Sequence, residues 1–296
     1  METVFQSDPD FAPAPARLGM FRLAGALQAA DALRWSERAI RIDPDTSWPR
    51  QTVCRAYLDL ADPMAARDAI GASQQDTAGP CLADLALYEG DWRRAAQFAF
   101  NTPGVALVGP GILGALSRYA SETGDTERVL ELLRGPDGEQ VETSKALAEG
   151  LFEQAFLLVQ LYQMRGDRAG RERVLEALWR WLPKAERGEF MHRESYPTRA
   201  MLMAWSGRDS EALDELLHWT RRRHSMYWWY VFEHDPTWQH LRSDPRFVEA
   251  RRLEREYVAG QRTTLETLRR HGAVPVRASK AARSLPGPEG EIVARR

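Results

Sequence analysis

Hydrophobic residues recur along the chain at helical spacing, in segments that are separated by short turns of one shared chemistry. The turns are Gly90-Asp91, Gly124-Asp125 and Gly166-Asp167, with Ala61-Asp62 and Gly207-Arg208-Asp209 as variants. Glycine readily ends a helix in the left-handed conformation, and aspartate caps the next helix by accepting its free N–H groups. The small residues of these turns are 29, 34, 42 and 41 residues apart. The pattern therefore predicts a series of antiparallel helix pairs.

The residues on either side of these turns also recur. Seven positions before the turns stand small or β-branched residues, namely Cys54, Ala83, Ser117, Val159 and Ala200. Five positions after the turns stand Ala66, Ala95, Val129 and Ala212, with Arg171 in the remaining pair. Small side chains on facing helices allow their backbones to approach closely. We therefore expect tight pairs, and an irregular one at Arg171.

In this register the chain resembles the tetratricopeptide repeat family, whose unit is a pair of helices with a period of 34 residues. The segments that carry the resemblance are Ala16–Met20, Cys54–Ile70, Leu82–Ala99 and Leu161–Leu178, together with Pro9 and Pro44 past the ends of second helices. The resemblance implies an all-α fold, a right-handed superhelical solenoid of about six helix pairs that spans residues 12–226. Longer connectors are expected near 135–150 and 183–197.

The two ends of the chain differ from the repeats. Residues 1–11 look like the last turns of a second helix without its first helix, so we expect either a capping helix or a remnant of a longer chain. Residues 273–296 are rich in Pro, Gly, Ala and basic residues, which predicts a disordered basic tail.

Residues 227–272 are expected to form an aromatic, helical C-terminal cap of the solenoid. This part resembles the ending of repeat arrays in bacterial winged-helix regulators of the CadC type and in some adenylate cyclases. The matching residues are Asp235-Pro236, Leu241-Arg242 and Asp244-Pro245-Arg246-Phe247. No winged-helix or cyclase segment is present, so the resemblance implies the sensory or interaction region of a regulator. Asp235 is interpreted as a cap or turn residue.

The stretch "GVALVGPGILGALSRYA" contains Gly109-x-Gly111-x-x-Gly114, the spacing of a dinucleotide-binding loop. Such a loop also needs a second strand after its helix. The segment that follows Asp125 has helical period, so no such strand is expected. Pro110 instead fits the first turn of a repeat helix, where a missing N–H costs nothing. We interpret the glycines as structural, and they would leave one side of that helix bare.

Other candidate chemistry is sparse. The six histidines lack metal-ligand spacing, and Cys54 and Cys81 form neither a zinc motif nor a disulfide framework, so both are expected to be small buried thiols. We expect no cofactor, no bound metal and no catalytic residue. Arg221–Arg223 followed by Tyr227–Tyr230 could indicate a single-strand nucleic-acid binder. The interpretation that we favour is a basic helix end followed by aromatic cover for the open end of the solenoid.

The expected binding surface is the concave groove lined by the first helix of each pair. The repeat register places in it Met20, Arg55, Asp84, Arg118, Gln160 and Met201, with Tyr88, Met164 and Trp205 in a neighbouring row. This mixed surface suits an extended peptide or a helix better than a small metabolite.

Bulk composition narrows the function further. A net charge of −2 disfavours nucleic acid as a partner, and no apolar run is long enough for a membrane span. The sequence predicts a non-catalytic module for protein interaction or sensing, cytoplasmic as it stands, or periplasmic if it was cut from a membrane-tethered regulator. The alternatives are an enzyme domain with an unrecognised site and a nucleic-acid binder that uses Arg221–Arg223 and the C-terminal helix.

Overall fold

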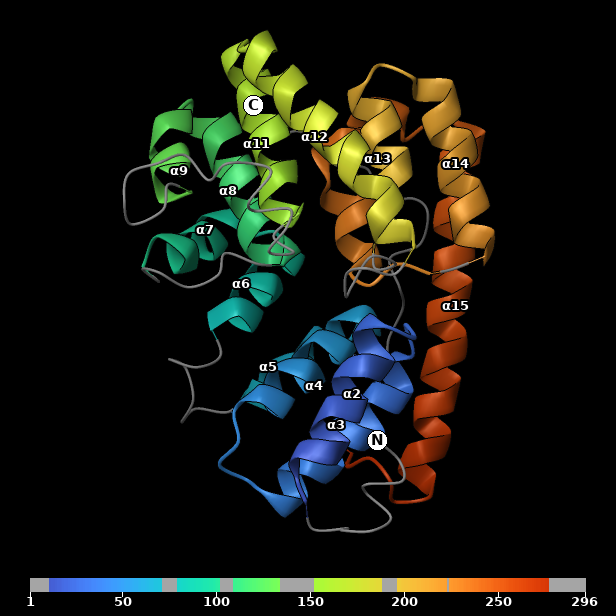
Figure 1. Ribbon diagram of the computed structural model, residues 1–296. Coiled ribbons are helices and arrows are strands. Elements are labelled where there is room, and N and C mark those ends of the chain that lie inside the picture. The colour runs from blue at the N-terminus through green and yellow to red at the C-terminus, as the bar shows by residue number, and fades with distance from the viewer. Residues whose placement is uncertain are drawn as a thin grey trace.

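The computed structural model describes residues 11–70, 79–101, 109–133, 152–187, 196–222 and 224–276. Within these ranges every regular element is a helix, which confirms the all-α prediction (Figure 1). The α-helices are α2 (Pro13–Ala24), α3 (Ala29–Ile42), α4 (Trp48–Asp59), α5 (Pro63–Ile70), α6 (Gly79–Tyr88), α7 (Trp92–Phe100), α8 (Pro110–Thr123), α9 (Thr126–Leu132), α11 (Phe152–Arg165), α12 (Arg168–Glu186), α13 (Thr198–Trp205), α14 (Asp209–Arg222) and α15 (Pro245–Arg270). A π-helical turn, η1 (Tyr230–His234), and a 3₁₀ helix, η2 (Pro236–Leu241), precede α15.

Consecutive helices pack as pairs, from α2 with α3 to α13 with α14. The predicted turn chemistry is confirmed. Gly90, Gly124 and Gly166 have φ angles of 82°, 74° and 69°, in the left-handed region. The aspartate that follows each glycine accepts a hydrogen bond from a backbone N–H three residues later. The turns are therefore determined locally by two residue types.

The small residues predicted at the helix contacts are buried. Cys54, Ala83, Ser117, Val159 and Ala200 are all at most 1% exposed. Arg171 is accommodated differently, because its guanidinium donates a hydrogen bond to the backbone carbonyl of Trp205 at the end of α13. Arg171 therefore connects its own helix pair to the next pair through this hydrogen bond.

The cysteines correct one expectation. Cys54 on α4 and Cys81 on α6 are joined by a disulfide, with 6.5 Å between their Cα atoms. A spacing of 27 residues matches no common cysteine motif. The two residues meet because α4 and α6, the first helices of successive pairs, pack against each other. The expectation of two free thiols was therefore wrong, although both residues are buried as predicted.

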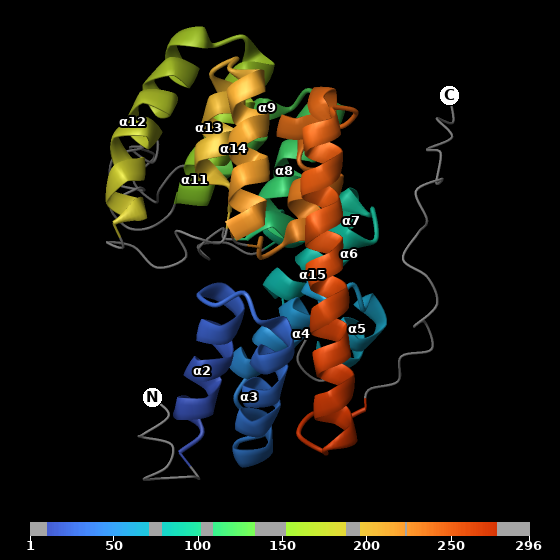
Figure 2. The same cartoon turned by 90° about the vertical axis from the view of Figure 1, so that its right-hand side faces the viewer.

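Helix α15 runs from α14, in the last helix pair, back to α3, in the first. Its 26 residues make it about 39 Å long, and it packs against both α14 and α3 (Figure 2). Tyr257 donates a hydrogen bond of 2.6 Å to the carbonyl of Leu27. Arg262 donates to the carbonyls of Leu60 and Ala61, both over 2.6 Å, at the end of α4. The C-terminal helix therefore fastens the last pair to the first two.

Several predicted boundaries fall outside the described residues. These are residues 1–10 of the expected remnant helix, the whole connector 135–150, and residues 277–296 of the tail. The second connector begins later than expected, because α12 continues through Pro183 to Glu186. In the tail, Val274 is buried rather than free in solvent. Among the described residues, no helix is long and apolar enough to cross a membrane.

Candidate functional site

The glycine motif at the start of α8 is a contact point between three first helices. The N–H of Gly109 donates a hydrogen bond of 2.8 Å to Glu153 on α11. The N–H of Gly111 donates one of 2.8 Å to Asp84 on α6. A helix N-terminus attracts anions, because its N–H groups are unpaired and its dipole is positive there. Here two carboxylates of the chain itself accept hydrogen bonds from these N–H groups.

Asp84 is the centre of a buried ion pair. Its Oδ2 atom lies 2.9 Å from Nε of Arg55 on α4, and the carboxylate is 1% exposed. Burial raises the pKa of Asp84, whereas Arg55 and the Gly111 N–H act in the opposite direction. The guanidinium carbon of Arg55 also lies 5.8 Å from the ring centre of Tyr227. Two residues predicted for the groove are thus brought together, but as an internal contact.

The residues Met226–Phe232, called here the aromatic segment, lie against α4 and α8. The N–H of Tyr227 donates to Asp59 Oδ1 over 2.9 Å, and the indole of Trp228 donates to the Asp59 carbonyl over 2.8 Å. Tyr230 packs against Gly114, where a Cβ atom would collide with its ring. The prediction that these aromatics cover the open end of the array was therefore wrong. Tyr230 fills the space that Gly114 leaves bare, whereas Asp84 on α6 occupies the space beside Gly111.

The burial of the aromatic segment also bears on the nucleic-acid alternative. Tyr227, Trp228, Trp229 and Tyr230 are at most 8% exposed, so their faces are not available to stack on bases. Arg221 and Arg222 lie in the last turn of α14, where cations favour the helix dipole.

The remaining predicted groove residues are dispersed between core and surface. Met20 on α2 is half-buried, and Tyr88 is half-buried with its ring centre 5.3 Å from that of Trp229. Arg118 is exposed and pairs with Glu122 over 2.8 Å. Met164 is 38% exposed. Trp205 is buried, and its indole donates a hydrogen bond of 3.0 Å to Thr237.

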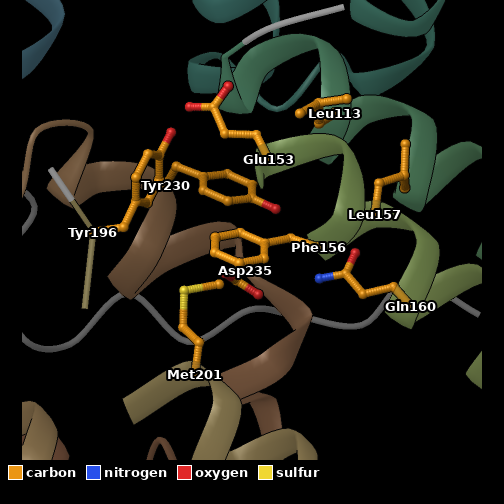
Figure 3. Close-up of a pocket in the computed structure, with 9 residues that line it drawn as sticks. All are labelled: Leu113, Glu153, Phe156, Leu157, Gln160, Tyr196, Met201, Tyr230 and Asp235. Atoms are coloured by element: carbon orange, nitrogen blue, oxygen red, sulfur yellow. The ribbon is translucent and has the colours of Figure 1, made fainter. Parts of the chain in front are cut away.

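Gln160 and Met201, the last two predicted groove residues, line one cavity of about 30 Å³ (Figure 3). The space holds roughly one or two water molecules. Its walls come from α8, α11, α13 and the segment before α15, and consist of Leu113, Glu153, Phe156, Leu157, Gln160, Tyr196, Met201, Tyr230 and Asp235. Figure 3 shows Gln160 and Met201 extending toward Asp235 from different helices. This cavity is the candidate functional site.

Two carboxyl groups line the cavity, and they differ in their partners. Glu153 accepts hydrogen bonds from the Gly109 N–H and from the hydroxyl of Tyr196, and burial raises its pKa. Asp235 is 1% exposed, and burial raises its pKa to about 6. Its Oδ1 accepts from the Thr237 N–H over 2.8 Å, as predicted for a capping residue. Its Oδ2 has no hydrogen-bond partner among the residues that the structure describes.

The cavity also contains residues that the sequence analysis did not select. Glu153 could have been noticed as an acid in the apolar stretch "LFEQAFLLVQL". Tyr196 precedes α13, and Tyr230 belongs to the aromatic segment, so neither lies on a repeat helix. The repeat register contains no information about them.

No protein-family model matches the chain, and no curated protein matches its sequence. The site must therefore be interpreted from its own geometry.

Proposed function

We propose that the chain is a non-catalytic helical-repeat module of the tetratricopeptide type, a right-handed solenoid that binds a protein or peptide partner. In this proposal it is the partner-reading or sensory part of a bacterial regulatory protein. The support from sequence is the recurrence of capped Gly-Asp turns and buried small residues in one register. The support from packing is the stack of paired helices.

The observation that carries the proposal is the surface formed by α8 and α11, which pack against each other. The aromatic segment covers the neighbouring side of α4, where Arg55 is engaged with Asp84. Along α8 and α11, in contrast, the side chains of Arg118 and Met164 are 58% and 38% exposed. Gln160 lies one helical turn before Met164, at the cavity. An exposed thioether, a cation and a cavity together form a mixed surface that suits a peptide.

The proposal can be tested by selecting peptides from a displayed library on the immobilised chain. The selected peptides are then titrated against wild type and Met164→Glu by calorimetry. Met164→Glu should weaken binding about tenfold or more, because a charge replaces an apolar contact. The matched control is Met64→Glu on α5, a methionine that is 42% exposed, and it should bind as wild type does. Peptides that bind both variants equally would place the interaction elsewhere and contradict the proposal.

A second candidate function, small-ligand binding or catalysis, is favoured by one observation. Glu153 and Asp235 line the same cavity, and burial raises the pKa of both, as at many catalytic sites. A thermal-shift screen of small polar compounds with wild type and Asp235→Asn would test it. A compound that stabilises wild type but not the variant would support this second function.

A further inference from the structure

We infer that the cavity beside Asp235 receives the ammonium group of a lysine side chain of the partner. The inference rests on the proposed function and adds the chemistry of the group that is recognised. Its starting point is the free oxygen of Asp235. This carboxylate is 1% exposed, lines the cavity, and accepts hydrogen bonds from the backbone N–H of Thr237, through Oδ1, and from the Thr237 hydroxyl. Within the described residues its Oδ2 is without a donor.

A buried carboxylate needs a counter-charge or several donors, because desolvation of the ion is otherwise unfavourable. No basic side chain of the described residues lines this cavity. Arg242 is the cation whose charge acts on Asp235, but its guanidinium donates to the backbone carbonyl of Glu233 instead. The other carboxyl, that of Glu153, accepts two hydrogen bonds. Within the described residues, the Oδ2 atom of Asp235 is therefore a carboxyl oxygen at this cavity without a hydrogen-bond donor.

The size and the walls of the cavity favour an ammonium group. About 30 Å³ accommodates a group the size of a water molecule, and the planar guanidinium of arginine is larger. Phe156, Tyr196 and Tyr230 provide aromatic rings, which attract cations through their faces. The side-chain amide of Gln160 provides a further acceptor. Charge, size and aromatic lining thus agree on one ligand group.

The approach to the cavity suits the stem of a lysine. Gln160 lines the cavity on the α11 side and is only partly buried. One turn further along α11, the exposed Met164 offers an apolar surface. The methylene groups of a lysine can pack on such a surface while the charged end is placed elsewhere.

The test uses the peptides selected on the full chain. In each peptide, every lysine is replaced in turn by norleucine, which keeps the stem and removes the charge. Parent and replaced peptides are titrated against wild type and Asp235→Asn. The asparagine keeps an oxygen that can accept from Thr237, and circular dichroism checks its fold. The control variant is Asp45→Asn, which changes an exposed aspartate between α3 and α4.

We expect one lysine whose replacement weakens binding to wild type about tenfold, the usual scale of a desolvated charge pair. With Asp235→Asn, the parent peptide should bind more weakly by a similar factor, and the replacement should have no further effect. Asp45→Asn should behave as wild type. Peptides that need Met164 but contain no essential lysine, or that use arginine instead, would overturn the inference and leave the proposed function intact. Peptides insensitive to Met164→Glu would contradict the proposed function itself.

Discussion

The backbone N–H of Gly111 donates a hydrogen bond of 2.8 Å to the Oδ1 atom of Asp84, and the two backbones approach so closely that no side chain fits between them. A Cβ atom at position 111 would collide with the backbone N and Cα of Asp84. The glycine spacing of α8 therefore follows from helix packing. The same N–H groups that make such a loop attractive to phosphate are used here by carboxylates of neighbouring helices.

Gly111→Ala should destabilise the fold by about 3 kcal/mol, because α6 and α8 must separate and the buried carboxylate loses a donor. Denaturant unfolding gives the free energy. The control is Gly260→Ala, within α15, where a Cβ would meet nothing within 4 Å. That change should stabilise the protein by roughly 0.5–1 kcal/mol through helix propensity. If Gly111→Ala were as stable as wild type, the close contact of α6 and α8 would be refuted.

Substitutions in two of the turns, at Gly124 and Ala61, should change the free energy of unfolding in opposite directions. Gly124 has a φ of +74°, and space around it is open, so Gly124→Ala tests backbone strain alone. We expect a loss of about 1 kcal/mol in the free energy of unfolding. Ala61 has the equivalent conformation with a φ of 53°. Ala61→Gly should therefore stabilise by about 0.5 kcal/mol, the relief of strain less the added entropy of the unfolded chain. Two changes of the same sign would contradict this account of the turns.

The disulfide between Cys54 and Cys81 has a direct chemical test. Without reductant, the denatured protein should resist alkylation at both positions, as read by intact mass. Closing a loop of 27 residues should contribute about 3.5 kcal/mol through the entropy of the unfolded chain. Dithiothreitol should lower the free energy of unfolding of wild type by that amount and leave Cys54→Ala/Cys81→Ala unchanged. Complete alkylation without reductant would show that the thiols are free.

The turns could be predicted because they depend on neighbouring residues only. Glycine and aspartate specify the φ angle and the cap at Gly90-Asp91 whatever surrounds them. The burial of Ala83 and Val159 followed from the same register. The disulfide could not be predicted in this way, because it depends on how one pair packs on the next. Cys54 and Cys81 match no spacing motif, and only the contact of α4 with α6 brings them together.

The candidate site was predictable only where it is built from repeat helices. Gln160 and Met201 were selected by register, and they do meet at one cavity. The position of the aromatic segment was predicted wrongly because it depends on contacts between distant parts of the chain. One of them joins Tyr227 to Asp59, 168 residues away. Arg55 and Asp84 were expected to face a partner, but they face each other. The opposite charges of Arg55 and Asp84 on successive first helices could have indicated this ion pair. The prediction considered only that both residues belong to one row of the groove.

Asp235 should make the stability of the protein depend on pH in a recognisable way. Its pKa is about 6 in the folded protein, against an ordinary value of 3.8. Burial is the main cause, opposed by the hydrogen bonds from Thr237 and by Arg242. The folded state therefore keeps this proton to higher pH than the unfolded state does. Its contribution to stability is complete below pH 4 and is lost as the pH rises through 6.

The difference in free energy of unfolding between wild type and Asp235→Asn separates the contribution of Asp235 from those of the other buried carboxyls. A shift of about two pKa units corresponds to about 3 kcal/mol. Denaturant unfolding at a series of pH values gives the free energy of unfolding of both proteins. Between pH 4 and pH 7, the free energy of unfolding of the variant should rise relative to that of wild type by about that amount. Asp244, the half-buried cap of α15, provides the opposite control, because the hydrogen bonds from Arg246 lower its pKa. Asp244→Asn should lose stability at neutral pH and match wild type in acid. A difference between wild type and Asp235→Asn that does not vary with pH would mean that Asp235 does not change its protonation in this range.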